Sequence, residues 1–541
     1  MPDSYKSISF WEGESKNFQG NQNIINEIEK MSQTSESNNK RIAKNTIALY
    51  FRMLITMIVG IYTSRVILDA LGEVDYGIYN VVGGFVTVFS LVSGTMTTAT
   101  QRFLSFEIGK NNPEAIRKVF SSAVLIHYLL AFITLIIAEV VGVWFLNTHM
   151  NFPADRYYAA NWVFQISLAT FLITIVSQPY NAALIAYEKM SAFAYLGILD
   201  VVLKLGICYL LYISPLDKLI FYAFLMGMTQ VLLRLIYGLY VAKKLPACKT
   251  SWRVDKPICK SMFSFVGWNM IGALAVIARE QGVNVILNMF FGPVVNAARG
   301  IAYQILSKVQ GFVGNFQLAF TPQIVKSYAQ NERDNMNKLV FRASKFSYLL
   351  MLGLSIPLII ETPAILGVWL KEVPDNTALF TRIVLFTSMF GALSNPLIAT
   401  MHASGKVKEY QIVVGGISLL TLPFVYAFLK LGSPAYVAML IVLLFEIICH
   451  VARVILLGRT IQFPVSAFFK EVTGHMLFIT VVAFIAPCLM YNFIDIPLLR
   501  FIVVTIVSVF SFALCSYYLG LDSHEREIVS AKIKSVIKKI Q

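Results

Sequence analysis

Charged residues are scarce in this sequence. Only 14% of its 541 residues are charged, whereas 57% are hydrophobic, and the mean hydropathy is +0.66. A soluble domain keeps about a quarter of its residues charged, so this deficit excludes a single large soluble core. Apolar runs of about 20 residues recur along the chain, and each is long enough to span roughly 30 Å of hydrocarbon. We therefore predict an all-α polytopic membrane protein.

The sequence also contains no cluster of cysteine or histidine residues. The chain has six of each, all dispersed, and no CxxC occurs. This spacing excludes a zinc site and a disulfide framework, and we expect neither a metal nor a cofactor. The net charge of +15 would suit nucleic acid, but basic residues also accumulate in the cytoplasmic loops of many-spanning proteins. We attribute the net positive charge to such loops and therefore expect no nucleic-acid partner.

Residues 1–39 contain no long apolar run. They are rich in Asn, Ser, Glu and Lys, which excludes both a signal peptide and a membrane span. We expect a disordered cytoplasmic tail, and Met31 is an alternative start.

The apolar runs and polar breaks predict about fourteen transmembrane helices. They lie near 46–67, 78–99, 119–146, 159–186, 191–213, 218–241, 265–291, 295–320, 344–370, 379–403, 410–430, 434–457, 473–493 and 497–519. Lys and Arg concentrate in alternate loops, and the positive-inside rule then places both termini in the cytoplasm.

The sequence repeats itself at an offset of about 220 residues. "SRVILDALG" (64–72) resembles "NVILNMFFG" (284–292), and "SQPYNAALIAYEK" (177–189) resembles "SNPLIATMHASGK" (394–406). Residues 100–130 resemble 321–350 in the same way. Each unit holds six spans, so we predict two parallel repeats around an axis along the membrane normal, with a central cavity between them.

This repeat divides the chain into six parts. They are the N-terminal tail (1–39), an N-terminal six-helix lobe (40–242), a basic cytoplasmic linker (243–264), a C-terminal six-helix lobe (265–458), two additional transmembrane helices (459–520) and a basic cytoplasmic tail (521–541).

Polar residues form stripes within several predicted spans. A charge at the centre of a span costs about 2.5–3.5 kcal/mol, so such residues usually face a bundle interior or an aqueous cavity. Helical spacing places those of one span on one face. We predict that they line one central, cationic, substrate-binding chamber, with packing roles as the alternative. The candidates are Arg52 in 46–67; Arg279, Glu280, Asn284 and Asn288 in 265–291; and Gln304, Lys308 and Asn315 in 295–320.

Other ionisable residues suggest coupling sites or structural pairs. Asp200 and Lys204 lie one turn apart and would neutralise each other. Glu446 and His450 also share a face, either as a proton relay or as a local hydrogen bond. Glu361, between two prolines, marks a helix break or a gate.

The segment "KNTIALYFRMLITMIVGIYTSRVILDALGEVDYGIYNVVGGF" (44–85), together with the repeat pattern, resembles the MOP exporter superfamily (multidrug/oligosaccharidyl-lipid/polysaccharide). The likeness is greatest to its polysaccharide-exporter branch, that of the Wzx-type O-antigen flippases. The resemblance covers roughly residues 40–520 and implies a MATE-like fold that works by alternating access. It does not carry over individual site residues.

The resemblance implies a flippase that moves undecaprenyl-pyrophosphate-linked oligosaccharide from the inner to the outer leaflet of the bacterial cytoplasmic (inner) membrane. Arg52, Arg279 and Lys308 would then hold the diphosphate, and Asn284, Asn288, Gln304 and Asn315 would contact sugars. Membrane lipids, a polysaccharide polymerase and glycosyltransferases are implied partners, and coupling to the membrane potential, H⁺ or Na⁺ stays open. The alternatives are a cation-coupled MATE-type drug or metabolite antiporter and a membrane-embedded glycan polymerase or acyltransferase. We do not expect this protein to be an enzyme, because its outer loops are too short for the sizeable outer loop that a membrane-embedded polymerase or acyltransferase would need.

Overall fold

The computed structural model describes residues 45–530, apart from 61, 64–65, 68, 73, 77, 80–81, 83–89, 150–152, 214–215, 251–254, 371–372, 524 and 528–529. The predicted N-terminal tail and positions 531–541 of the predicted C-terminal tail lie outside these residues.

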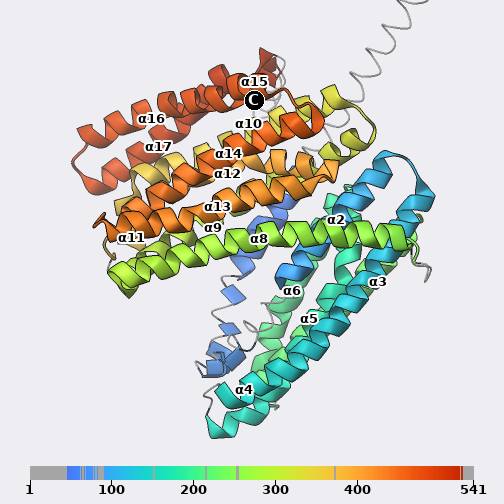
Figure 1. The fold of residues 1–541 in the computed structure, drawn as a ribbon. Helices are drawn as coiled ribbons and strands as arrows, with labels where there is room; N and C mark the ends of the chain where they lie inside the picture. Colours follow the sequence, from blue (N-terminus) through green and yellow to red (C-terminus); the bar gives the residue numbers. More distant parts are fainter. Residues whose placement is uncertain are drawn as a thin grey trace, which may run out of the picture.

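Throughout the described residues the chain is helical, without a strand, which confirms the predicted fold class (Figure 1). After a helix at Asn45–Gly60 come α2 (Ser90–Gly109), α3 (Pro113–Ile137) with α4 (Val143–His149), α5 (Tyr157–Ala186), α6 (Met190–Ile213), α7 (Lys218–Lys244), α8 (Lys256–Phe291), α9 (Pro293–Ala329), α10 (Arg333–Ile360), α11 (Thr362–Trp369), α12 (Thr377–Ser404), α13 (Val407–Lys430), α14 (Tyr436–Ile461), α15 (Val465–Phe468) with α16 (His475–Phe493), and α17 (Pro497–Cys515). Short π-helical stretches join α3 to α4 and α15 to α16. Eleven helical segments of the described chain are long and apolar enough to cross a membrane.

Several helices begin and end beyond the predicted spans because polar caps, rather than hydropathy, set their limits. The Asp255 side chain accepts a hydrogen bond from the Ile258 N–H at 3.1 Å and starts α8 at Lys256. Residues 256–264 of the predicted linker are therefore helical. Asn112 caps α3 in the same way. Such caps satisfy N–H groups that have no partner within the helix.

The turns between helices support the internal repeat. Gly72 and Gly292, in the first pair of matching segments, have φ of 80° and 76°. Asn111 and Asn331 follow α2 and α9 with φ of 53° and 59°. Glu188 and Gly405 follow α5 and α12 with φ of 57° and 74°. Left-handed backbone is uncommon, so three equivalent occurrences show that the matching segments build matching turns.

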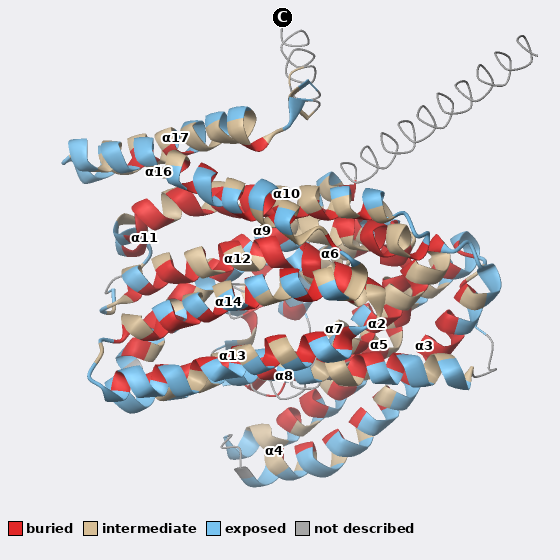
Figure 2. Cartoon of the chain, turned by 45° about the horizontal axis from the view of Figure 1, so that its top comes forward, coloured by how far each residue is buried: buried red, intermediate tan, exposed pale blue. Residues whose placement is uncertain are grey.

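Figure 1 shows α3–α6 in one group and α9–α17 in another, with α8 running across both. We call residues 45–244 the N-lobe and residues 256–461 the C-lobe. Buried residues are densest in α10, α12 and α14, while α17 has few buried residues (Figure 2). The largest hydrophobic cluster spans these C-lobe helices and α9. The two lobes meet where α2 packs on α8 and α9.

The predicted helix break at Glu361 is confirmed, because α10 ends at Ile360 and α11 begins at Thr362. The Glu361 side chain is fully buried, and Arg500 Nε lies 3.2 Å from its Oε1. Glu361 thus ties α17 to the C-lobe. Nothing in the fold tests a gating role.

Three loops that the charge pattern assigns to the outer side meet at Arg156. Its guanidinium donates hydrogen bonds to Asp75, with Nε 2.8 Å from Oδ1, and to Asp217 Oδ2 at 2.7 Å. Asp217 also caps α7 through the N–H groups of Leu219 and Ile220. The contacts support placing the three loops on one side of the membrane.

We expect Arg156→Gln to lower the free energy of unfolding by roughly 1 kcal/mol at neutral pH, because these side chains are partly exposed. Partial burial alone would raise the pKa of Asp217, but hydrogen bonds from Ile220 and Arg156 outweigh burial and lower that pKa. Asp217 therefore stabilises the fold above its unfolded pKa, and this stabilisation is lost as the pH falls through the lower folded pKa. Melting curves from pH 7 to pH 3 should show the wild-type advantage shrinking in acid. Lys118→Gln, which breaks an exposed pair with Glu114, is the control and should show a smaller effect.

Candidate functional site

A cavity of about 790 Å³ lies inside the C-lobe, between α8, α9, α12, α13 and α14, and reaches Thr95 and Thr98 of α2. Its wall carries many amide and hydroxyl side chains. Those it draws from the C-lobe are Asn269, Tyr303, Ser307, Gln310, Gln317, Thr387, Ser388, Asn395, Tyr410, Gln411 and Ser418. Arg279, Glu280, Glu446 and Arg453 are its charged residues among those described.

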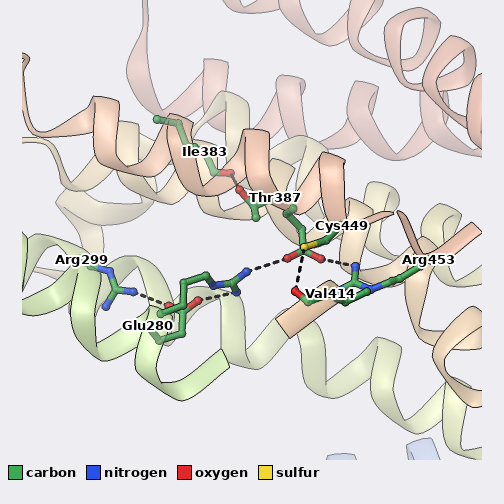
Figure 3. Close-up of polar contacts among 9 residues, drawn as sticks. Glu280, Arg299, Ile383, Thr387, Val414, Cys449 and Arg453 are labelled. Atoms are coloured by element: carbon green, nitrogen blue, oxygen red, sulfur yellow. Dashed lines mark hydrogen bonds and ion pairs between the residues drawn. The ribbon is translucent and has the colours of Figure 1, made fainter. Parts of the chain in front are cut away.

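These charges form one continuous network (Figure 3). Arg279 donates to Glu446 Oε2 from Nη1 at 3.1 Å and to Glu280 Oε1 from Nη2 at 2.9 Å. At one end Arg299 Nη2 lies 2.5 Å from Glu280 Oε2, and at the other Arg453 Nη1 lies 2.7 Å from Glu446 Oε1. We call these five residues the ion network. Arg279 and Glu280 are thus placed in an apolar run because partners on α9 and α14 compensate their charges.

The ion network carries one net positive charge, since three guanidiniums face two carboxylates. Apart from Glu280, whose side chain is 24% exposed, its members are at most 11% exposed. Buried charges are tolerated only when paired and hydrogen-bonded. Glu280 is therefore the member of the ion network most accessible from the cavity.

Amide pairs continue the polar wall between helices. Asn395 Nδ2 donates to Gln317 Oε1 at 2.8 Å, and Gln411 Nε2 donates to Asn269 Oδ1 at 2.8 Å. Gln317 and Asn395 also line a second cavity of about 310 Å³ that reaches Thr98 and Gln101 of α2. The amide pair thus lies where the two cavities adjoin.

The structure brings Arg279 and Glu280 into the cavity wall but leaves Arg52 and Lys308 apart from it. The Arg52 guanidinium stacks on the Phe193 ring of α6 at 4.4 Å from its centroid, within the N-lobe. Lys308 and Gln304 are exposed on α9 and outside the cavity lining. Of the three predicted cations, this cavity therefore has only Arg279 in its wall, and a single chamber that unites all three stays a prediction.

The helical phase of α9 explains the difference. The cavity is lined by Tyr303, Ser307, Gln310, Gly314 and Gln317, spaced as one face of a helix. The predicted stripe lies one residue further along, about 100° around the helix. Within that stripe Asn315 contacts the N-lobe, with its Nδ2 3.1 Å from Met53 Sδ, while Gln304 and Lys308 are exposed.

Asn284 and Asn288 lie at the α8–α9 turn rather than in the cavity. The Asn296 side chain donates to both the backbone O and Oδ1 of Asn284 at 2.8 Å, and Asn288 Nδ2 reaches Asn296 Oδ1 at 3.4 Å. These contacts join α8 to the start of α9, which is a packing role.

The two predicted pairs differ in outcome. Lys204 Nζ donates to Asp200 Oδ2 at 2.7 Å, so the local pair forms. Glu446 and His450 do not bond to each other. His450 instead contacts Ser394 Oγ at 2.9 Å and Thr473 Oγ1 at 3.1 Å, while Glu446 is bound by two arginines. The expected hydrogen bond between Glu446 and His450 is therefore wrong. Glu446 accepts instead from Arg279 of α8 and from Arg453, two turns further along α14.

Sequence reasoning missed Arg299, Arg453 and the amides at Gln310, Gln317 and Asn395. Arg453 lies seven residues after Glu446, on the same helical face, and that spacing was a usable signal. Nothing local marks Gln310 or Asn395, because single amides are common on helices. In the described part of the chain no group of His, Cys, Asp and Glu is arranged to hold a metal ion.

Two contacts join the lobes at the ends of α2 and α9. Arg102 of α2 donates to the carbonyl oxygens of His402 and Ala403, both at 3.0 Å, at the end of α12. On α9, Lys326 Nζ and Gln323 Nε2 donate to Glu188 at 2.5 and 2.6 Å. Glu188 and Gly405 occupy equivalent turns of the two repeats, so the contacts are related by the repeat.

The MatE family model matches residues 46–210, which lie in the N-lobe. A comparison with curated proteins finds no match.

Solved structures match much more of the chain. An outward-facing multidrug resistance MATE family transporter of the MOP superfamily is 13% identical, with a TM-score of 0.68 over 80% of this chain and 96% of that one. A MATE protein in complex with MaD3S is 14% identical, with a TM-score of 0.67 over 80% and 97%. A MOP superfamily transporter from Pyrococcus furiosus, for which reverse polarity of the binding pocket suggests a different function, is 13% identical, with a TM-score of 0.63 over 80% and 96%. The chain therefore has the fold of the MATE transporters, and part of its N-lobe also matches the MatE family model.

Proposed function

We propose that this protein is a flippase that moves an undecaprenyl-pyrophosphate-linked oligosaccharide, such as an O-antigen unit, across the bacterial inner membrane by alternating access. One observation carries the proposal: a cavity of about 790 Å³ whose wall combines many amides and hydroxyls with the ion network. Sugars present hydroxyl groups that both donate and accept, and amide side chains match both roles. An apolar drug would leave without a hydrogen bond those cavity groups that have no partner in the protein, such as the Ser418 hydroxyl, at a cost of about 1–3 kcal/mol each.

The ion network supplies a reason for the cargo to be anionic. Its three guanidiniums outnumber its two carboxylates, and this net positive charge attracts the diphosphate of a cargo head in the cavity. Arginine binds phosphate oxygens in a bidentate manner. Of the predicted anchors, Arg279 fits this role best, while Arg52 and Lys308 would have to act in another conformation. The lipid chain stays in the bilayer, and only the head crosses.

A cation-coupled MATE-type antiporter is the second candidate, and a specific observation favours it. The chain is similar in fold to solved MATE transporters and matches the MatE family model over part of the N-lobe. The Glu280 and Glu446 carboxylates in the cavity wall could bind a cation or a proton that is exchanged for a drug. This alternative needs no glycan contact.

A deletion strain separates the two candidates. The flippase predicts loss of surface glycan with accumulation of the lipid-linked unit at the inner leaflet, and unchanged drug resistance. The antiporter predicts drug hypersensitivity with normal glycan. Normal glycan in the deletion strain would end the flippase proposal. Polymerase and glycosyltransferase partners follow only from the first outcome.

Two glutamines on α9 offer a matched pair of variants. Gln310 is exposed in the cavity, whereas Gln304 is exposed on the face outside it. Gln310→Leu should reduce glycan export roughly two- to tenfold, the effect of losing one or two hydrogen bonds. Gln304→Leu should leave export near the wild-type level at equal protein amounts. Equal effects would mean that the cavity does not select the cargo.

A further inference from the structure

A third hollow, separate from both cavities, opens between the first turns of α13 and the last turns of α14. It measures about 650 Å³, and we call it the basic groove. Its lining consists of Lys406, Lys408, Glu409, Ile412, Val413, Arg459 and Thr460. It shares none of these residues with the cavity.

The basic groove combines three cations with one carboxylate. Among the described residues neither Lys406 nor Arg459 forms an ion pair, and Lys408 Nζ lies 5.3 Å from the centroid of the Trp268 ring. Tryptophan is enriched at the level of lipid headgroups. The groove lies at the ends of helices that the positive-inside rule assigns to the cytoplasmic face.

An apolar surface runs from the basic groove toward the centre of the membrane. On α14, Leu444, Ile448, Val451 and Ile455 are all exposed and lead, at helical spacing, to Arg459. Ile412, 51% exposed, forms the apolar wall of the groove on α13. A ligand with an anionic head and an acyl chain would match both parts.

We propose that the basic groove binds the headgroup of an acidic phospholipid of the cytoplasmic leaflet. The phosphate accepts hydrogen bonds from Lys406, Lys408 and Arg459, and an acyl chain lies along the exposed α14 residues. Basic pockets between transmembrane helices on the cytoplasmic side bind anionic headgroups in this way. The assignment depends on the membrane orientation and not on the transported cargo.

Native mass spectrometry of the full-length protein in detergent tests the proposal, with phosphatidylglycerol and phosphatidylcholine as probes. We expect wild-type protein to retain phosphatidylglycerol. The triple variant Lys406→Gln/Lys408→Gln/Arg459→Gln should bind this lipid at least about tenfold more weakly. The control Lys243→Gln/Lys244→Gln/Lys260→Gln removes equal charge on the same side, outside the groove, and should bind as wild type does.

Three results would overturn the assignment. Equal retention of phosphatidylcholine would remove the selectivity for an acidic headgroup. Equal loss in both triple variants would show that overall charge, rather than the groove, attracts the lipid. A co-purifying polyprenyl diphosphate that phosphatidylglycerol cannot displace would make the groove a cargo site instead.

Discussion

Glu446→Ala is expected to lower the free energy of unfolding by about 3–5 kcal/mol. Glu446 accepts from Arg279 at 3.1 Å and from Arg453 at 2.7 Å, and all three side chains are 10–11% exposed. Removing the carboxylate leaves Arg453 without its partner in the ion network and Arg279 with Glu280 alone. A buried charge without a partner is far more costly than the loss of an exposed pair.

The measurement is the folded yield and melting midpoint of purified protein in detergent, with Glu114→Ala as the control. Glu114 forms an exposed pair with Lys118, so its loss should change little. The double variant Glu446→Met/Arg453→Met removes both charges and should regain much of the lost stability. If Glu446→Ala melted at the same temperature as Glu114→Ala, the ion network would not stabilise the C-lobe.

The order of the membrane helices could be predicted from the sequence, because each helix depends on an apolar run within its own segment. A run of apolar residues predicts a membrane helix wherever it occurs, and each of the fourteen predicted spans contains part of a described helix. The matching turns at Asn111 and Asn331 show that the repeat was also real. Helix ends were less predictable, since caps such as Asp255 extend helices beyond the apolar run.

The candidate site could be predicted from the sequence only in part, because its side chains come together from several helices. Arg279 and Glu280 stood out as charges in an apolar run, but their further partners Glu446 and Arg299 come from other helices. Helical periodicity gives the faces of α9 without saying which one meets the cavity. That choice depends on how α9 packs against α12 and α2, and no pattern within α9 records it.

The contacts between the lobes lie where the proposed alternating access would require movement. Arg102 holds the carbonyl end of α12, where a cation is favoured by the helix dipole. Lys326 and Gln323 hold Glu188 in the equivalent turn of the other lobe. In between, Gly109 brings α2 against α9, and a Cβ built there would lie 2.9 Å from Cα and O of Lys326 and 3.0 Å from Ala329 Cβ. Alternating access requires these helix ends to separate.

Joining the two helix ends with the pair Gly109→Cys/Ala329→Cys should therefore abolish transport in oxidising conditions, and a reductant should restore it. The two helix ends must move slightly apart to admit the disulfide, because a Cβ at position 109 would lie 2.9 Å from the Lys326 backbone and bridged Cβ atoms lie about 3.5–4.5 Å apart. The assay is glycan export or drug efflux, whichever the deletion strain loses, in a background whose native cysteines are replaced. Each single cysteine variant should stay active in oxidant, which separates cross-linking from the cost of adding a side chain at Gly109. Undiminished transport by protein that mass spectrometry shows to be cross-linked would mean that the ends of α2 and α9 stay together throughout the cycle.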